Sequence, residues 1–282
     1  TDDEWDADII AVNTCCFIGD AKQESINTIL EMAEHKKDAK CKVLVAAGCL
    51  AHRYQDEIIK EIPEVDAFFG KFDWKGVLER MGEHFDERIR NQRVLTTPDH
   101  YAYLKISEGC NRTCSYCAIP IMTGKHKSRD FEELLEECRA LVKGGVKEIL
   151  VVAQDLTYYG IDLYGKNRLA ELIGRIADIE GLEWIKLHYA YPAGFPLELL
   201  TVMRERPNVC KYLDIALQHC SDHMLQQMRR GISKKQTIEL IRKIRQEVPG
   251  IFIRTTLMTG HPGETAEDFE ELCEFVREMR FE

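Results

Sequence analysis

The chain has 282 residues, of which 45% are hydrophobic and 30% are charged, and its formal net charge is −10. This composition is typical of a globular protein, and the absence of any apolar run as long as a membrane span argues against an integral membrane protein. The acidic balance argues against tight nucleic-acid binding by the chain alone, since such binding depends on basic surface.

The first 92 residues alternate strand-like and helix-like patterns. Short apolar runs predict strands over residues 8–13, 42–48 and 65–69. Helical patterns predict helices over residues 20–37 (with Asp20 as the cap), 53–62 and 71–91. Strands that are apolar throughout are typical of parallel sheets. Their alternation with helices predicts an open parallel α/β sheet domain over residues 1–92.

A second run of alternation begins after a polar linker at residues 93–100. Strands are predicted over residues 101–107, 147–153, 183–189, 212–217 and 251–258. Helices are predicted over residues 131–143, 168–179, 197–204, 234–247 and 265–279. Thr265 and Asp268 have the spacing of a capping box for the last helix. Five βα units predict a partial TIM-like (β/α)6 barrel over residues 101–282, whose sixth strand would begin where the chain stops.

Eleven cysteines occur in a chain that opens with the acidic run Thr1-Asp2-Asp3-Glu4, the opposite of a secretory signal peptide. We therefore expect reduced thiols in a cytoplasmic protein, where clustered cysteines are more often metal ligands or catalytic groups than disulfides. The chain does not begin with Met, and we expect it to be part of a longer protein.

Three of the cysteines follow the first predicted barrel strand. Cys110, Cys114 and Cys117 have the spacing C-x3-C-x2-C. Thiolates are the usual ligands of iron–sulfur clusters, and three of them would leave one iron of a cubane cluster open to a substrate. Zinc sites more often combine two C-x2-C pairs, and the sequence has no second pair. The spacing therefore favours an iron–sulfur site over a zinc site or three ordinary thiols.

Conspicuous polar residues follow every predicted barrel strand. The segments are the cysteine loop at 108–120, Gln154-Asp155, residues 189–192, Gln218-His219 and residues 260–264. Active sites of βα barrels lie at the C-terminal ends of the strands. These segments therefore predict one catalytic mouth.

The cysteine spacing, with the aromatic Tyr116 before the last cysteine, resembles the radical S-adenosylmethionine (SAM) superfamily. Within it, the chain resembles the methylthiotransferases, and among these the group that modifies ribosomal protein S12. The resemblance covers essentially the whole chain. The motifs that carry it are residues 107–120, 153–160, 212–219, 228–231, 254–256 and 262–265, with 12–15 and 47–51 in the first domain.

The resemblance implies an enzyme that transfers a methylthio group to the β-carbon of an aspartate in S12. Cys110, Cys114 and Cys117 would hold a [4Fe–4S] cluster whose open iron binds SAM. Reductive cleavage of SAM would give a radical that removes hydrogen from the aspartate, and a further SAM would supply the methyl group. The implied partners are S12, free or in the small ribosomal subunit, an external electron donor and a sulfur donor.

The resemblance also implies a second, auxiliary [4Fe–4S] cluster that delivers sulfur. Cys15 and Cys49 stand at matching positions in an N-terminal methylthiotransferase domain. The family's first auxiliary cysteine follows a strand that this chain lacks, so we expect an incomplete auxiliary cluster. Cys16 is then either a spare thiol or an alternative ligand. The family's C-terminal TRAM module, which binds the macromolecular substrate, is also missing, so we expect poor SAM cleavage and no complete methylthiolation by this chain.

Five further residues match positions near SAM in the superfamily. They are Tyr116 against the adenine, Gln154 and Asp155 near the amino end, and Gly260 and Glu264 near the adenine. Four of them have a plainer interpretation: a core aromatic for Tyr116, a helix cap for Asp155, and a turn for Gly260 and Glu264.

Other notable residues favour structural roles. We expect His219 to be a buried, satisfied histidine. The basic run Arg229-Arg230 with Lys234-Lys235 is more often a solvated helix face than an RNA contact. Cys41, Cys138, Cys210 and Cys273 are expected to be structural thiols.

Three other functions compete with this interpretation. The nearest is a tRNA (adenosine) methylthiotransferase with the same clusters, which the acidic charge disfavours. The others are a non-catalytic iron–sulfur scaffold or electron carrier and a zinc-binding structural module.

Overall fold

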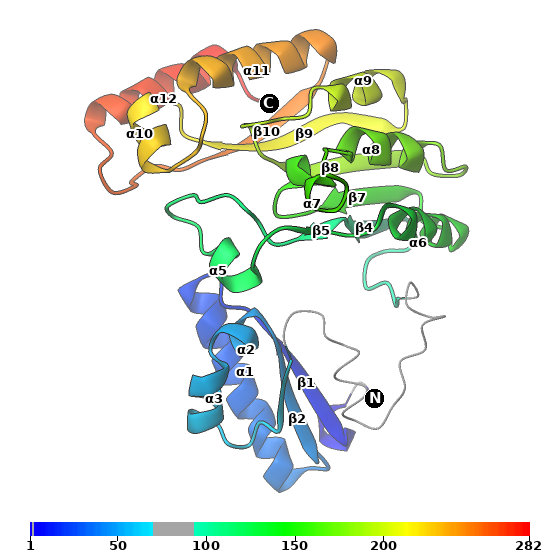
Figure 1. Ribbon diagram of the computed structural model, residues 1–282. Coiled ribbons are helices and arrows are strands. Elements are labelled where there is room, and N and C mark those ends of the chain that lie inside the picture. Colours follow the sequence, from blue (N-terminus) through cyan, green and yellow to red (C-terminus); the bar gives the residue numbers. More distant parts are fainter. Residues whose placement is uncertain (2, 70–92) are drawn as a thin grey trace. The chain divides into compact units, whose positions relative to one another are not determined.

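The computed structural model of the chain describes residues 1, 3–69 and 93–282, and it divides into two compact units (Figure 1). Unit 1 comprises residues 1–88 with 118–124, and unit 2 comprises residues 89–117 with 125–282. The predicted helix over 71–91 lies outside the described residues. No helix in the described part of the chain is long and apolar enough to cross a membrane.

Unit 1 is built on a three-stranded parallel sheet. Its strands, in sheet order, are β1 (Ile9–Thr14), β2 (Val43–Gly48) and β3 (Ala67–Phe69). The other elements are a 3-10 helix (Glu4–Asp6), α1 (Gly19–Asp38), α2 (Cys49–Arg53), α3 (Gln55–Glu61) and α5 (Ile119–Thr123). Thr14 pairs with Gly48, so β1 and β2 end at the same edge of the sheet.

Two details of unit 1 differ from the sequence prediction. Helix α1 starts one residue before Asp20, and its N-cap Ile18 makes no side-chain hydrogen bond, so Asp20 is not the cap. Of the helix predicted over 53–62, residues 55–61 form α3, whereas Arg53 ends the separate helix α2, and the two helices are divided at Tyr54. The break lets both of them bury apolar side chains, such as Leu50 and Ile58, in the same core.

Unit 2 is built on a five-stranded parallel sheet in which neighbours in sequence are neighbours in space. Its strands, in sheet order, are β4 (Tyr101–Lys105), β7 (Glu148–Val152), β8 (Trp184–Ala190), β9 (Val209–Gln218) and β10 (Phe252–Leu257). The connecting helices are α6 (Phe131–Lys143), α8 (Leu169–Ala177), α9 (Glu198–Glu205), α11 (Lys234–Glu247) and α12 (Ala266–Met279). This sequential parallel order is that of a partial βα barrel, as predicted.

Several short elements of unit 2 were not predicted from the sequence. They are the antiparallel pair β5 (Ser107–Glu108) and β6 (Lys127–Ser128), the 3-10 helix at Leu156–Tyr158, α7 (Ile161–Tyr164) and α10 (Asp222–Gln227). Elements of two to six residues are too short to show a hydrophobic period. All of them lie in the loops that follow the strands.

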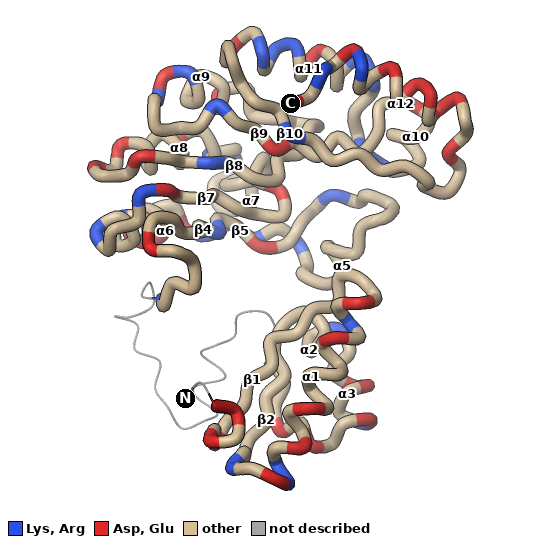
Figure 2. The backbone as a smooth tube through the Cα atoms, turned by 180° about the vertical axis from the view of Figure 1, so that it is seen from behind, with Lys and Arg blue, Asp and Glu red and all other residues tan. Residues whose placement is uncertain are grey.

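Helices α11 and α12 carry opposite charge (Figure 2). Lys234 of α11 pairs with Glu271 of α12 at 2.7 Å, and Arg242 pairs with Glu278 at 2.9 Å. Acidic side chains of α12 therefore neutralise much of the positive charge of α11. Lys235 remains on a solvated face, as predicted.

The capping box predicted for α12 is present and extends into a buried network. The Asp268 carboxylate accepts from the backbone N of Thr265 at 3.1 Å and from its Oγ1 at 3.0 Å. It also contacts Ser221 Oγ and His223 Nδ1. Hydrogen bonds from Ser221, His223 and Thr265 lower the pKa of Asp268.

We expect Asp268→Asn to destabilise the chain by about 2 kcal/mol at neutral pH, because it removes charge-assisted hydrogen bonds to a buried group. A lowered pKa gives stability that is present above the ordinary aspartate pKa of 3.8 and is lost as the pH falls below it. The difference in unfolding free energy between the parent and Asp268→Asn should therefore shrink in acid. Urea unfolding across this pH range measures it, with the exposed Glu267→Gln as control. A difference independent of pH would contradict the prediction.

Candidate active site

The three predicted cluster cysteines lie together on the loop that follows β5. Cys110 is buried, and Cys114 and Cys117 are partly exposed. Gly109 has φ +76°, a left-handed conformation that turns the chain directly into the loop. The loop also holds Ser115, whose Oγ donates to the carbonyl of Gln227 at 2.9 Å. The cysteine loop is thus anchored to the last residue of α10.

Two of the three sulfurs accept a hydrogen bond from a nitrogen donor. The backbone N–H of Arg112 donates to Cys110 Sγ at 3.4 Å, and Arg230 Nη1 donates to Cys114 Sγ at 3.2 Å. Tyr191 Oη lies 3.7 Å from Cys114 Sγ. Burial raises the pKa of the Cys110 thiol. Donors in these positions would serve thiolates held by a metal, because metal binding deprotonates cysteine ligands.

This donor set fits the ligand shell of an iron–sulfur cluster. Three thiols on one loop supply the sulfur ligands, and N–H groups directed at sulfur are the usual way a protein stabilises such ligands. Among the residues that the structure describes, no three His, Cys, Asp or Glu side chains gather closely enough to hold one metal ion. A cubane cluster is larger than a single ion and bridges thiols that lie further apart.

Asp155 anchors the cysteine loop from the end of β7. Only 2% of Asp155 is exposed, and its Oδ2 accepts from Arg112 Nε at 2.8 Å. Its Oδ1 accepts from the backbone N of Thr157 at 2.9 Å and from its Oγ1 at 2.5 Å. The plainer interpretation of Asp155 as a helix cap is therefore confirmed, because it caps the 3-10 helix at Leu156–Tyr158.

Gln154 presents an acceptor without a partner. Its Nε2 donates to Glu108 Oε1 at 2.6 Å. Its Oε1 is buried and accepts no hydrogen bond within the described part of the chain. A buried acceptor of this kind carries a desolvation cost unless a donor fills it. The end of β7 is therefore suited to an amino group of a ligand.

Glu264 and Gly260 form a closed turn with His219. Glu264 Oε2 accepts from the backbone N of Gly260, which has φ +77°. Glu264 Oε1 lies 3.1 Å from Nε2 of His219, which is fully buried. Because His219 Nδ1 accepts from the backbone N of Ser221, Nε2 carries the proton and donates to Glu264. The predicted buried, satisfied histidine is confirmed.

Tyr116 lies within the cysteine loop, and its hydroxyl is directed at the Arg230 guanidinium. Its Oη accepts from Arg230 Nη1 at 3.1 Å, and its ring meets the ring of His261 edge to face at 6.4 Å. Burial raises the pKa of Tyr116 far above its usual value, so the phenol stays neutral. Ser115 Oγ also lies 3.3 Å from His261 Nε2, which ties the loop after β10 to the cysteine loop.

Sequence reasoning gave no site role to Arg230 and placed Tyr191 only within the segment 189–192 of the predicted mouth. The prediction of a solvated face for Arg230 was wrong, because only 3% of it is exposed. The Tyr191 ring lies between two guanidinium groups, with Arg112 at 4.0 Å and Arg230 at 4.1 Å from the ring centre. Both residues stand in segments that follow barrel strands, and that position was the available signal.

Two strands end in strained backbone at this mouth. Tyr189 in β8 has φ 68°, and Gln218 at the end of β9 has φ 71°. Non-glycine residues rarely adopt this conformation, and such strain clusters at functional sites. Gln218 Oε1 is also buried and lacks a partner among the described residues. The strained backbone and the buried acceptor both lower stability, so these strand ends indicate a functional site.

The predicted auxiliary cysteines lie in unit 1 at the shared edge of β1 and β2. Cys15 directly follows Thr14, and Cys49 directly follows Gly48, the residues that pair across the two strands. Gly48 has φ +97°, and a Cβ there would lie 2.4 Å from the Thr14 carbonyl oxygen, so only glycine fits. Ser25 Oγ accepts from the backbone N of Cys15 at 2.9 Å.

Cys16 is buried in the core of unit 1. Burial raises the pKa of its thiol, and the neighbouring thiols of Cys49 and Cys15 raise it further. Cys16 therefore lies near both predicted auxiliary ligands, but as a neutral core thiol.

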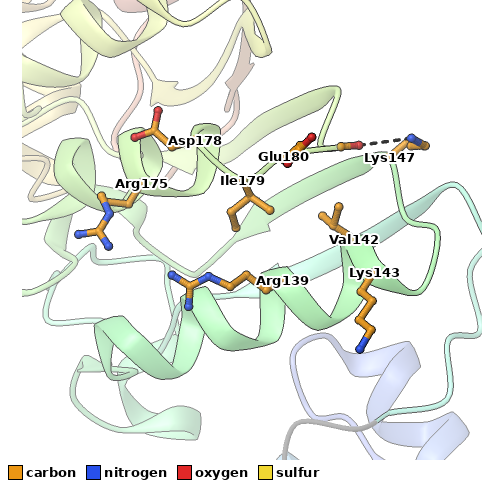
Figure 3. A pocket seen from close by; sticks show the side chains of 9 residues that line it. Arg139, Val142, Lys143, Lys147, Arg175, Asp178, Ile179 and Glu180 are labelled. Carbon is orange, nitrogen blue, oxygen red and sulfur yellow. Dashed lines mark hydrogen bonds between the residues drawn. The ribbon is translucent and has the colours of Figure 1, made fainter.

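A basic groove of about 570 Å³ lies at the N-terminal ends of the unit 2 strands, whereas the candidate site lies at their C-terminal ends (Figure 3). Arg139 and Lys143 of α6 and Arg175 of α8 line it, and Lys147 Nζ donates to the carbonyl of Gly181 at 3.4 Å. Three of these four cations stand in the second halves of α6 and α8, where positive charge complements the helix dipoles. The groove contains none of the predicted site residues.

Two family models match the chain. Residues 104–276 match the radical SAM superfamily, and residues 1–70 match the uncharacterized protein family UPF0004.

Curated relatives named ribosomal protein uS12 methylthiotransferase RimO resemble the chain over almost its whole length. The Porphyromonas gingivalis protein is 64% identical over 98% of this chain and 63% of its own length. The Bacteroides fragilis protein is 63% identical, and the Cytophaga hutchinsonii protein is 50% identical, over similar shares. The chain spans just under two thirds of the length of these relatives.

Solved structures of radical SAM enzymes share the fold. The methyltransferase TsrM from Kitasatospora setae, solved with cobalamin and a [4Fe-4S] cluster, has a TM-score of 0.65 at 13% identity, over 98% of this chain and 63% of that chain. OxsB, a cobalamin-dependent SAM radical enzyme, has a TM-score of 0.67 at 14% identity, over 95% of this chain and 43% of that chain. At these identities the likeness concerns the fold alone.

Proposed function

Because the chain belongs to the radical SAM superfamily, we propose that it is the core of a methylthiotransferase that acts on an aspartate of ribosomal protein S12. The observation that carries the proposal is the set of three thiols on the loop after β5, met by N–H donors from Arg112 and Arg230. The identity of 64% to a relative named for this activity supports S12 as the substrate.

The cysteine loop is the proposed site of a [4Fe–4S] cluster. Cys110, Cys114 and Cys117 are its ligands, and the cluster, when bound, supplies the electron that cleaves SAM. Asp155 fixes Arg112 and with it the path of the loop. Gln154 offers a buried acceptor to the amino end of SAM. Tyr116, Gly260 and Glu264 are proposed to lie near the adenine.

Cys15 and Cys49 are the proposed ligands of the auxiliary [4Fe–4S] cluster. The paired ends of β1 and β2 hold both at one edge of the sheet. We propose that residues 1–92 form the methylthiotransferase domain, residues 93–100 the linker and residues 101–282 the radical SAM domain. The partners are S12, an electron donor and a sulfur donor, and a ribosomal substrate implies a cytoplasmic site of action.

Mass spectrometry of offered substrates tests the proposal. The chain is reconstituted anaerobically with iron and sulfide, reduced, and given SAM with either purified S12 or tRNA, beside the Porphyromonas gingivalis relative as positive control. We expect a methylthio group on an S12 aspartate with the relative and weak SAM turnover with the chain. A methylthio group on adenosine of tRNA from either protein, with S12 unmodified, would instead support the tRNA methylthiotransferase.

A further inference from the structure

We propose that Arg230 is a positioning residue that holds Cys114 and raises the reduction potential of the cluster bound there. The inference rests on the proposed function, because it needs a cluster at the cysteine loop. It adds a residue whose side chain comes from outside that loop. Arg230 lies 116 residues from Cys114 in the sequence.

Arg230 is a buried cation without a carboxylate partner among the described residues. Its Nη1 donates to Cys114 Sγ at 3.2 Å and to Tyr116 Oη at 3.1 Å, and its Nη2 donates to the carbonyl of Ala216. Its Nε is buried without an acceptor in the part of the chain described. A buried cation is costly unless an anion compensates it. The Cys114 sulfur is the atom of the set that becomes anionic.

The backbone at Arg230 is held from two sides. Helix α10 ends in a Schellman motif, in which the N–H of Arg230 donates to the Leu225 carbonyl at 2.9 Å and the N–H of Arg229 donates to the Gln226 carbonyl at 3.0 Å. Arg229 has φ 55°, which this motif requires. Tyr191 Oη donates to the carbonyl of Arg230 at 2.7 Å. The guanidinium is therefore placed by the fold.

Tyr191 couples the two arginines of the site. Its ring lies 4.1 Å from the Arg230 guanidinium and 4.0 Å from that of Arg112. Cations near an aromatic face are attracted by its negative charge density. Arg112 is already paired with Asp155, whereas Arg230 is not paired with a carboxylate in the described chain. Of the two, Arg230 retains the charge that can act on a cluster.

The direction of the effect follows from charge. A [4Fe–4S] core of charge 2+ with three thiolates has a net charge of −1, which becomes −2 when one electron is added. A nearby cation therefore stabilises the reduced state more than the oxidised state. Hydrogen bonds to the sulfurs act in the same direction. Removing Arg230 should make the cluster harder to reduce.

The test is a redox titration of the reconstituted protein, followed by the electron paramagnetic resonance of the reduced cluster. All variants carry Cys15→Ala and Cys49→Ala, so that one cluster site is measured. We compare the parent with Arg230→Met, Arg230→Lys and Arg229→Met. Arg229→Met removes the positive charge of the residue before Arg230, and this residue is exposed.

We expect Arg230→Met to bind iron like the parent but to shift its midpoint potential to a more negative value. At the midpoint of the parent, its ratio of reduced to oxidised cluster should fall about tenfold, or ~59 mV for one electron. Arg230→Lys keeps the charge and should fall between the two, and it also serves if Arg230→Met does not fold. Arg229→Met should match the parent.

Two results would overturn the inference while the proposed function stands. One is that the parent and Arg230→Met both bind the full complement of iron and have equal midpoint potentials. This includes the case in which Arg230→Met weakens only the affinity for SAM. The other is an equal shift in Arg229→Met, which would reflect general charge. A parent chain that binds no iron would instead overturn the proposed function together with the inference.

Discussion

Replacing Cys114 with alanine is expected to abolish SAM cleavage, with a loss of more than about 100-fold, because even outer-shell changes at metal sites cost up to about that much. Cys114 Sγ accepts a hydrogen bond from Arg230 and lies within hydrogen-bonding distance of Tyr191 Oη. Its loss removes a proposed ligand and leaves the buried Arg230 cation without its sulfur partner. The assay is the formation of 5′-deoxyadenosine under anaerobic, reducing conditions, together with bound iron.

Cys273→Ala is the matched control for this experiment. Cys273 is a partly exposed cysteine in α12, outside the cysteine loop. Its loss should leave both iron content and SAM cleavage unchanged. Undiminished product from Cys114→Ala would remove Cys114 from the ligand set. Zinc in place of iron after anaerobic purification of the parent would contradict the enzyme interpretation itself.

Replacing Asp155 with alanine is expected to destabilise unit 2 by about 3 kcal/mol, because it breaks a largely buried ion pair and leaves Arg112 uncompensated. It also removes the N-cap of the 3-10 helix, in which Asp155 accepts a hydrogen bond from the backbone N of Thr157. The Arg112 side chain is 24% exposed, so solvent relieves part of the cost. Urea unfolding measures the change, and iron content reports whether the cysteine loop keeps its path.

An exposed pair of the same chemistry provides the comparison. Asp178 and Arg206 lie 3.1 Å apart, and about half of each side chain is exposed. Asp178→Ala should therefore cost less than about 1 kcal/mol. In a double-mutant cycle, Arg112→Ala should recover part of the loss caused by Asp155→Ala. Equal effects of Asp155→Ala and Asp178→Ala would show that burial does not strengthen the site pair.

Regular elements with a strong hydrophobic period were predicted well. Helices α6 and α11 occupy the predicted residues, and the Thr265 capping box is present. The predicted helix boundaries were wrong where the local sequence is compatible with more than one start or end of a helix. Asp20 is a good cap by type but lies inside the first turn of α1, and the helix predicted from Arg53 breaks at Tyr54. The local sequence does not encode the break that lets both short helices face the core.

The candidate site divides in the same way. The proposed ligand set of Cys110, Cys114 and Cys117 follows from the sequence alone, because their spacing along the chain places three thiols on one loop whatever surrounds it. The sequence also predicted that Asp155 and Glu264 lie in segments that directly follow barrel strands. Whether their carboxylates are free for a ligand was not predictable.

The sequence by itself thus determined the cluster motif, the βα order and the family resemblance, all of which depend on neighbours along the chain. Only the tertiary structure decided that Arg230 is buried against Cys114 and that Tyr191, 77 residues from that cysteine, lies between two guanidinium groups. The reason is physical: the state of a charged side chain depends on what packs over it. Those groups come from strands and turns that only folding brings together.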